Sequence, residues 1–284
     1  MIEKKFTLAG AGLVGSLLAI YLAKKGHRVD VFERRKDMRL ETIGAGRSIN
    51  LSLSNRGWKA LAGVGIDDEV RQMAIPMYKR VMHALDGSLT DQAYGKDGEA
   101  IYSVSRGGLN ALLMDLAEQE DKVNIHFNKK CIDVNLKEAS STFEDVFTKE
   151  VTKVEADHLV GADGVYSAVR TQMQRQDRFN YEQRYIEHGY KELVIPANED
   201  GTHQLEMNAL HIWPRGTYML IALPNLDGSF TCTLFFPFKG RYSFESLKDD
   251  AAILSFFKEV FPDAVSLMPT LLQDFKENPT SSLG

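Results

Sequence analysis

The sequence contains few cysteines, and their spacing indicates neither a disulfide framework nor a metal site. Its two cysteines among 284 residues, Cys131 and Cys232, lie far apart. No His/Cys cluster has metal-ligand spacing, so we expect no bound metal. A disulfide-stapled secreted scaffold is also excluded. We expect both thiols to be reduced core residues in a cytoplasmic protein.

Long hydrophobic runs and an excess of basic charge are also missing. No apolar stretch approaches the ~20 residues that a membrane helix needs, so we predict no membrane segment in this chain. The apolar N-terminus is interrupted by glycines and does not have the pattern of a signal peptide. The net charge of −5, with 26% charged residues, argues against a nucleic-acid partner. These absences favour a soluble enzyme of one large or two modest domains.

A glycine-rich pattern near the N-terminus is typical of a dinucleotide-binding βαβ unit. A short apolar strand leads into Gly10-x-Gly12-x-x-Gly15, and a helix over 13–25 and a second strand over 28–32 follow. Glu33 stands at the end of that second strand. Strand, glycines, helix, strand and acid are therefore all in the order that this unit requires.

Each part of the pattern has a physical role. Gly10 allows a tight turn, Gly12 lets the backbone approach a pyrophosphate, and Gly15 lets the helix lie close to the sheet. The helix N-terminus offers free N–H groups and a partial positive charge to phosphates. Glu33 can accept both hydroxyls of an adenosine ribose. The residues alone leave the choice between NAD and FAD open at this point.

The chain after Glu33 departs from the regular strand–helix alternation of an NAD dehydrogenase. An alternating strand around residues 49–53 precedes a helix over 55–64. A later strand ends at Ser105-Arg106, where Ser105 can cap a helix over 107–118. Further on, an apolar strand runs into Gly161-Ala162-Asp163-Gly164, behind which a helix starts.

The combination of these motifs resembles the FAD-dependent aromatic hydroxylases. The resemblance implies tightly bound FAD, transient NADPH and an α/β fold. In that fold a Rossmann-like FAD-binding domain is interleaved with a substrate domain on a mixed or antiparallel sheet. We predict the FAD-binding domain at residues 1–74 and 97–178, and the substrate domain at 75–96 and 179–284. The cofactor-binding residues that pattern and resemblance indicate are Gly10, Gly12, Leu13, Val14, Gly15, Glu33, Arg34, Arg35, Ser52, Arg106, Cys131, Asp163 and Ala168.

Blocks across the chain, including residues 46–54, 210–215 and 229–235, are similar to the branch of this family that hydroxylates L-kynurenine. The resemblance implies that Arg80 binds the substrate carboxylate and that Tyr94 adds a hydrogen bond. It also implies an apolar pocket wall. The residues of that wall are Leu210, Ile221, Leu223 and Phe235.

The implied reaction converts L-kynurenine to 3-hydroxykynurenine with NADPH and O2, through a flavin C4a-hydroperoxide. The flavin carries the chemistry, so we name no catalytic side chain. From the residues alone, Arg80 and Tyr94 also fit a surface arginine and a packing tyrosine, and the four apolar residues fit ordinary sheet core. His211 and Trp213 alternate with the apolar residues of their strand, and we assign them no catalytic role.

The sequence departs from the family pattern in one respect. A second flavin motif of the family contains a Gly-Asp turn, and no Gly-Asp dipeptide occurs here. We therefore expect the chain to be an N-terminal portion of a longer protein, ending in a helix over 249–260 and a polar tail. Three alternatives stay open: a flavin monooxygenase for another aromatic acid, a FAD-binding module without catalysis, and, third, an NAD dehydrogenase.

Overall fold

The chain folds into two compact units, each assembled from three stretches of sequence. The structure is a computed structural model that describes residues 2–40, 49–96 and 98–283. Unit 1 takes residues 1–43, 60–66 and 108–182, and unit 2 takes 44–59, 67–107 and 183–284. These units group residues by compactness. We predicted the domain boundaries from which ligand each part binds, FAD or substrate, and those boundaries stay a prediction.

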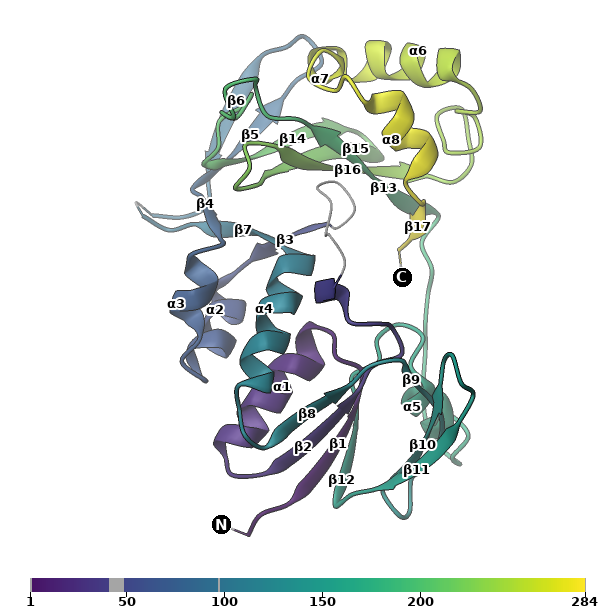
Figure 1. The fold of residues 1–284 in the computed structure, drawn as a ribbon. Coiled ribbons are helices and arrows are strands. Elements are labelled where there is room, and N and C mark those ends of the chain that lie inside the picture. Colours follow the sequence, from purple (N-terminus) through teal and green to yellow (C-terminus); the bar gives the residue numbers. More distant parts are fainter. Residues whose placement is uncertain (1, 41–48, 97, 284) are drawn as a thin grey trace. The chain divides into compact units, whose positions relative to one another are not determined.

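Unit 1 is built on a four-stranded parallel sheet and a three-stranded antiparallel sheet (Figure 1). The parallel sheet has the strand order β12-β1-β2-β8, and the antiparallel sheet has the order β11-β10-β9. Its elements are β1 (Lys5–Ala9), α1 (Leu13–Lys24), β2 (Arg28–Phe32), the 3-10 helix η1 (Met38–Leu40), α4 (Arg106–Glu118, which begins in unit 2), β8 (Val123–His126), β9 (Lys129–Asn135), β10 (Ser140–Asp145), β11 (Val151–Glu155), β12 (His158–Gly161) and α5 (Ala168–Met173).

The parallel sheet of unit 1 is covered on both faces by apolar side chains. Helix α1 buries Ala19, Ile20 and Ala23. A separate cluster joins Phe32 of β2 to Phe143 of β10, whose rings stack with centroids 4.0 Å apart. The first strand, the first helix and the second strand lie where the sequence predicts them, to within a residue or so. The glycine-rich segment is thereby held at the carboxyl end of β1.

Unit 2 contains a seven-stranded sheet and a smaller antiparallel sheet. The large sheet has the order β17-β13-β16-β15-β14-β5-β6, and the small one has the order β3-β7-β4. The elements are β3 (Asn50–Leu53), α2 (Asn55–Ala62, which ends in unit 1), α3 (Asp67–Arg71), β4 (Ile75–Met77), β5 (Lys79–His83), β6 (Leu89–Ala93), β7 (Ile101–Ser105), β13 (His188–Ile195), β14 (Ala209–Arg215), β15 (Tyr218–Pro224), β16 (Phe230–Pro237), α6 (Asp250–Val260), α7 (Pro262–Val265), α8 (Leu271–Glu277) and β17 (Ser281–Ser282).

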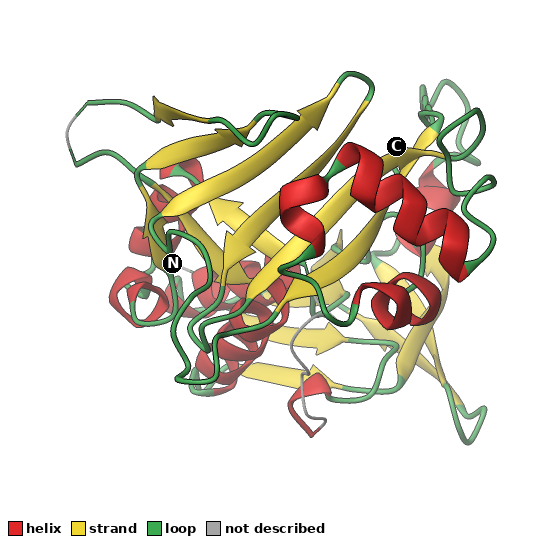
Figure 2. Ribbon diagram, turned by 90° about the horizontal axis from the view of Figure 1, so that it is seen from above, coloured by secondary structure: helices red, strands yellow, loops and turns green. Residues whose placement is uncertain are grey.

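One face of the seven-stranded sheet packs against α6, α7 and α8, which lie over its strands in Figure 2. Alternate residues of β13, β15 and β16 face this core, as strand geometry requires. In β15, for example, Leu220 and Ala222 belong to it, whereas Ile221 packs in a different cluster. The predicted strands near 209–238 are confirmed. The polar tail predicted after residue 260 is wrong: α7, α8 and β17 form there, because Leu271 and Phe275 are buried in this core.

The antiparallel alternation of the seven-stranded sheet is interrupted between β14 and β5. These two strands pair in parallel, with Leu210 opposite Arg80 and Ile212 opposite Met82. The other pairs given by the described residues of this sheet are antiparallel. The β5–β6 hairpin is therefore joined to the rest of the sheet through the single β5–β14 pair.

Lys191 of β13 is a buried cation that ties the sheet to α8. Its ammonium group donates hydrogen bonds to the carbonyl oxygens of Phe275, at 2.8 Å, and Asn278, at 2.7 Å. These carbonyls lie at the C-terminal end of α8, where a helix has no internal donors for them. We expect Lys191→Met to lower the free energy of unfolding by about 2–3 kcal/mol, because two buried acceptors lose their donor.

Chemical denaturation of the two proteins measures this change. Lys153→Met is the matched control, since exposed ion pairs such as Lys153 with Glu155 contribute about 0–1 kcal/mol. An equal, small effect of both substitutions would contradict the structural role of Lys191.

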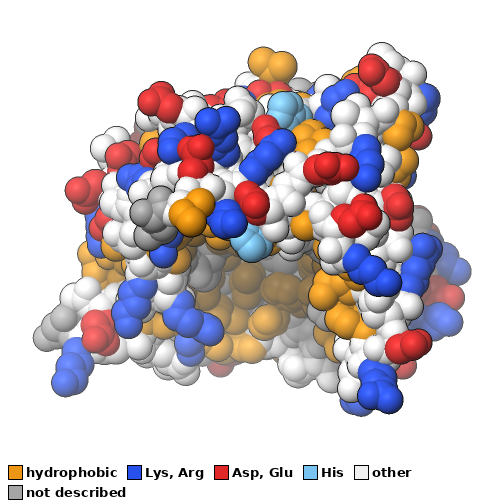
Figure 3. Space-filling view, turned by 90° about the horizontal axis from the view of Figure 1, so that it is seen from below, with side chains coloured by type: hydrophobic (Ala, Val, Ile, Leu, Met, Phe, Trp, Pro, Cys, Tyr) orange, Lys and Arg blue, Asp and Glu red, His pale blue; other side chains and the backbone are white. Residues whose placement is uncertain are grey.

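The surface carries charges of both signs. Arg39 lies within 2.8 Å of oxygens of Asp37, Asp115 and Glu118 in unit 1. On the face shown in Figure 3, Lys and Arg side chains are interspersed with Asp and Glu side chains. That face therefore presents no extended patch of a single sign. None of the described helices combines the length and the apolar character that crossing a bilayer requires.

Candidate functional site

The turn between β1 and α1 depends on its glycines for packing. Gly10 has a positive φ of 101°, and its N–H donates to the carbonyl of Phe32 at 2.8 Å. A Cβ on Gly10 would lie 2.5 Å from the carbonyl oxygen of Ala162, and a Cβ on Gly15 would lie 1.9 Å from the carbonyl oxygen of Gly10. Both positions therefore exclude a side chain. The close approach joins this turn to the end of β12.

Gly12 differs from its two neighbours because the space beside it is open. A Cβ there would meet no heavy atom of the described chain within 4 Å. Gly12 is the N-cap of α1, and no side chain caps the helix. Leu13 and Val14 form the first turn, which contains no acidic residue, and Val14 is exposed. The N–H groups of this helix end, together with the helix dipole, are thus available to an anionic group.

Glu33 is buried next to the glycine turn. Its Oε2 accepts the N–H of Ala11 at 3.0 Å, and its Oε1 accepts the backbone and side-chain N–H groups of Arg35 at 3.0 and 2.9 Å. Burial alone would raise the pKa of Glu33, but the hydrogen bonds from Arg35 and Ala11 outweigh it and hold that pKa below its ordinary value. Both lone pairs of Oε1 are used by Arg35, whereas Oε2 keeps one for a further donor, such as a ribose hydroxyl. The neighbouring Arg34 is exposed.

The lowered pKa of Glu33 predicts acid sensitivity. The carboxylate stabilises the folded state above its ordinary pKa of 4.5, and this contribution is lost as pH falls through the lower pKa of the folded state. We expect Glu33→Gln to flatten the decline of unfolding free energy below pH 4.5, measured by denaturation at successive pH values. Glu69→Gln, at an exposed position, is the control. If the unfolding free energy of Glu33→Gln declines below pH 4.5 as steeply as that of the wild type, Glu33 does not have this role.

Asp163 lies directly after β12, against the glycine turn. Its Oδ2 accepts the N–H groups of Ala168 at 2.6 Å and Val169 at 3.4 Å, so it orders the start of α5. Its Oδ1 is buried and has no hydrogen-bond partner within the described chain. Leaving such an acceptor unpaired is costly, so a ligand with hydroxyl or amide donors fits here.

Asn110 of α4 is a candidate that the sequence analysis missed. Its Nδ2 donates to the carbonyl of Ala11 at 3.2 Å, inside the glycine turn. Its Oδ1 is buried without a partner among the described residues. The feature of the sequence that could have indicated it is the position of this polar side chain in a helix, between Leu109 and Leu113, which are both buried. Asn110 therefore adds a second free acceptor near the turn.

For Cys131, Ser52 and Arg106, which we also predicted to bind the cofactor, the structure gives no hydrogen bond to the glycine turn among the described residues. Cys131 of β9 is half-buried, and burial, with the charges of Asp163 and Asp133, raises the pKa of its thiol to about 12. It is therefore a thiol at neutral pH. Ser52 of β3 and Arg106, whose N–H donates to the carbonyl of Ile49, belong to unit 2 and are exposed. Their cofactor roles stay predictions.

The predicted substrate residues share one face of the seven-stranded sheet, the face opposite the helices. Leu210 and Leu223 form a buried cluster with Met77, and Tyr94 and Ile221 pack against it. Phe235 lies on the same face, because its register partner on β15 is Met219, two residues from Ile221. The structure thus groups these side chains on a largely apolar surface.

Arg80 and Tyr94 are in contact at the edge of this surface. The Arg80 guanidinium carbon lies 4.6 Å from the centroid of the Tyr94 ring. Burial raises the pKa of the Tyr94 hydroxyl, and the Arg80 charge acts in the opposite direction. Arg80 is exposed and lies beside Leu210 across the parallel pair. A carboxylate could therefore bind to Arg80 while an attached ring lies on the apolar surface.

Comparison with known proteins identifies the class. The family model described as "FAD binding domain" matches residues 5–217. The chain belongs to this family of flavoproteins, and FAD is its cofactor. The free acceptors of Asp163 and Asn110, the open space at Gly12 and the uncapped helix end are compatible with that group.

The chain is also similar to individual proteins. It is 54% identical over 279 residues to a kynurenine 3-monooxygenase of Flavobacterium johnsoniae, and 48% identical over 284 residues to one of Dictyostelium discoideum. The matches cover 98% and 100% of this chain but only 62% and 60% of those relatives. Among solved structures, a 2-methyl-3-hydroxypyridine-5-carboxylic acid oxygenase has a TM-score of 0.75 at 22% identity, covering 100% of this chain and 70% of its own. That likeness confirms the aromatic-hydroxylase fold class predicted from the sequence.

Proposed function

We propose that this chain supplies the FAD site and the substrate surface of a kynurenine 3-monooxygenase, which hydroxylates L-kynurenine to 3-hydroxykynurenine with NADPH and O2. The observation that carries the proposal is the Arg80–Tyr94 pair beside an apolar sheet face. The names of the relatives support it, since they share about half of their matched residues with this chain.

In this proposal, the residues of unit 1 hold the ADP part of FAD. The α1 N-terminus binds the pyrophosphate, and Oε2 of Glu33 accepts a hydrogen bond from a ribose hydroxyl. FAD, when bound and reduced by NADPH, supplies the oxygen-transfer chemistry. Asp163 and Asn110 each offer one acceptor to cofactor hydroxyl or amide groups.

The side chains of unit 2 orient the substrate. Arg80 pairs with the carboxylate of L-kynurenine, and Tyr94 donates a hydrogen bond to it. The ring lies against Leu210, Ile221, Leu223 and Phe235, which exclude water from it. The amino group of the substrate activates its ring, so the chain needs no protein base.

A second candidate concerns the 284-residue chain by itself: a FAD-binding module without catalysis. The absence of a Gly-Asp dipeptide from the sequence favours it. Equilibrium titration of the FAD-loaded chain with L-kynurenine, followed by the flavin absorption spectrum, separates the two. Saturable binding with a spectral shift supports the proposed substrate surface, and no binding of L-kynurenine by a yellow protein contradicts it. A screen of other aromatic acids by the same titration tests the substrate class.

A further inference from the structure

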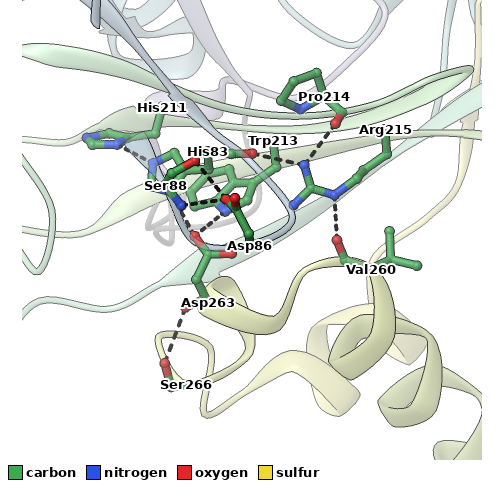
Figure 4. Close-up of polar contacts among 10 residues, drawn as sticks. All are labelled: His83, Asp86, Ser88, His211, Trp213, Pro214, Arg215, Val260, Asp263 and Ser266. Carbon is green, nitrogen blue, oxygen red and sulfur yellow. Dashed lines mark hydrogen bonds and ion pairs between the residues drawn. The ribbon is translucent and has the colours of Figure 1, made fainter. Parts of the chain in front are cut away.

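A buried chain of hydrogen bonds crosses the helix-covered face of the seven-stranded sheet (Figure 4). Asp263 Oδ2 lies 2.8 Å from His83 Nδ1, and His83 Nε2 lies 2.9 Å from His211 Nδ1. His211 Nε2 in turn lies 3.0 Å from the backbone carbonyl of Glu206. Trp213 Nε1 donates to the same Asp263 oxygen at 2.8 Å, and the His83 and Trp213 rings are stacked. His83 and His211 are 4% and 3% exposed, and the Asp263 side chain is 28% exposed, so the link between the two rings is shielded from water.

The three links of this chain need three protons. The Glu206 carbonyl only accepts, so His211 Nε2 must carry a proton. The link between the two rings holds one more, on either ring nitrogen. The link to Asp263 needs a third, because an ionised carboxylate facing an unprotonated ring nitrogen would place two acceptors against each other at 2.8 Å. Two neutral histidines bring only two protons. The geometry therefore requires one proton more than an ionised Asp263 and two neutral rings contain.

The surroundings limit the cluster to this one extra proton. Burial lowers the pKa of His211 to about 4 and also lowers that of His83, where the Asp263 carboxylate acts in the opposite direction. Arg215 of β14 and Lys79 of β5 also oppose protonation, whereas Glu206 favours it. With one extra proton, Asp263, His83 and His211 together carry no net charge, which is the state that the two buried rings favour.

The cluster lies behind the substrate surface of the proposed function. His83 is three residues from Arg80 on β5, and His211 follows Leu210 on β14. The link between the two rings spans the single β5–β14 pair that joins the Arg80 hairpin to the rest of the sheet. Asp263 then connects both strands to α7.

We infer that Asp263, His83 and His211 share one extra proton at neutral pH and, through it, hold β5 on β14, which makes them positioning residues for Arg80. The shared proton is located either on a ring or on the carboxyl group. The part of this inference that concerns Arg80 depends on the proposed function, whereas the proton count does not.

Counting the protons by NMR tests the inference on the wild-type protein. We expect three exchange-protected downfield protons in the FAD-loaded, 15N-histidine-labelled protein at pH 7.5, in addition to the Trp213 indole proton. His83→Gln and His211→Gln assign them. Finding only two protons in these three links would overturn the inference of a shared proton. The count is made on the wild-type protein, so the test remains valid even if a variant fails to fold.

The pH dependence of stability is a second test. Above pH 6.5 the folded state retains a proton that the unfolded chain has released, so the unfolding equilibrium constant should rise by up to tenfold per pH unit until the cluster itself titrates. Asp263→Asn should remove this rise, because an uncharged amide no longer balances the charge of the extra proton, so both rings stay neutral. Asp30→Asn is the matched control, since Asp30 pairs with His126 on the surface of unit 1. Equal slopes in wild type and Asp263→Asn would overturn the inference.

Substrate affinity tests the positioning role. His83→Gln should weaken L-kynurenine binding by at least about tenfold with FAD content unchanged, because small displacements of a binding group cost large factors. Unchanged affinity in this variant would overturn the positioning role. If wild-type protein binds no L-kynurenine, the proposed function fails, and the proton count alone decides whether the cluster shares its proton.

Discussion

Replacing Arg80 with alanine is expected to weaken L-kynurenine binding by about 2–5 kcal/mol, or roughly 30-fold to several-thousand-fold. The Arg80 guanidinium group lies at the edge of the apolar surface. Among the described residues, it is the cation that lies against the Tyr94 ring. In the proposed complex, its removal leaves the substrate carboxylate without its cationic partner. Titration of the FAD-loaded protein, followed by the flavin spectrum, measures the change.

Lys79→Ala is the matched control for this experiment. Lys79 is the neighbouring cation on β5 but points to the other face, where it pairs with Asp91 at 2.6 Å and Glu206 at 2.8 Å. We expect Lys79→Ala to change L-kynurenine affinity less than threefold, on the order of one exposed ion pair. If Arg80→Ala binds as tightly as wild type, or if both variants lose affinity equally, Arg80 does not bind the carboxylate.

The second large effect separates two glycines of the same turn. Gly15→Ala should lower the free energy of unfolding by about 3 kcal/mol, because its Cβ would overlap the Gly10 carbonyl oxygen and α1 must move. Gly12→Ala should change that free energy by less than about 1 kcal/mol, since its Cβ meets nothing in the chain. In the proposed FAD site, the same Cβ would occupy the space of the pyrophosphate, so FAD affinity should fall at least about tenfold.

Thermal denaturation of the FAD-free proteins and FAD titration by fluorescence quenching measure the two effects separately. Gly12→Ala with normal FAD affinity would mean that the pyrophosphate does not approach α1 at this point. Gly15→Ala with normal stability would mean that the turn has room that the structure does not show.

The features that the sequence predicted well are local ones. The order of strand, glycines, helix and acid places Gly10, Gly15 and Glu33, because the contacts of Gly10 with Phe32, of Gly15 with Gly10 and of Glu33 with Ala11 each join residues within about 30 positions. Period-two alternation likewise placed Ile221 and Leu223 on one strand face. The proposed role of Arg80, in contrast, came from the resemblance, because an exposed arginine on a half-buried strand is common and does not by itself indicate a ligand.

The features that the sequence did not predict depend on distant segments. His83 and Asp263 are 180 residues apart and meet only because α7 folds back on the sheet. The parallel pairing of β5 with β14 also joins segments more than a hundred residues apart, and alternation within one strand cannot identify a partner. Asn110 was missed for a related reason: its link to Ala11 crosses 99 residues.

The most direct test of the proposed activity is NADPH oxidation by the full-length, FAD-loaded gene product with and without L-kynurenine, followed by mass analysis of the product. We expect strong stimulation by L-kynurenine and a product heavier by one oxygen atom. A yellow protein whose NADPH oxidation does not respond to L-kynurenine, or responds without oxygen insertion, would contradict the proposed hydroxylation.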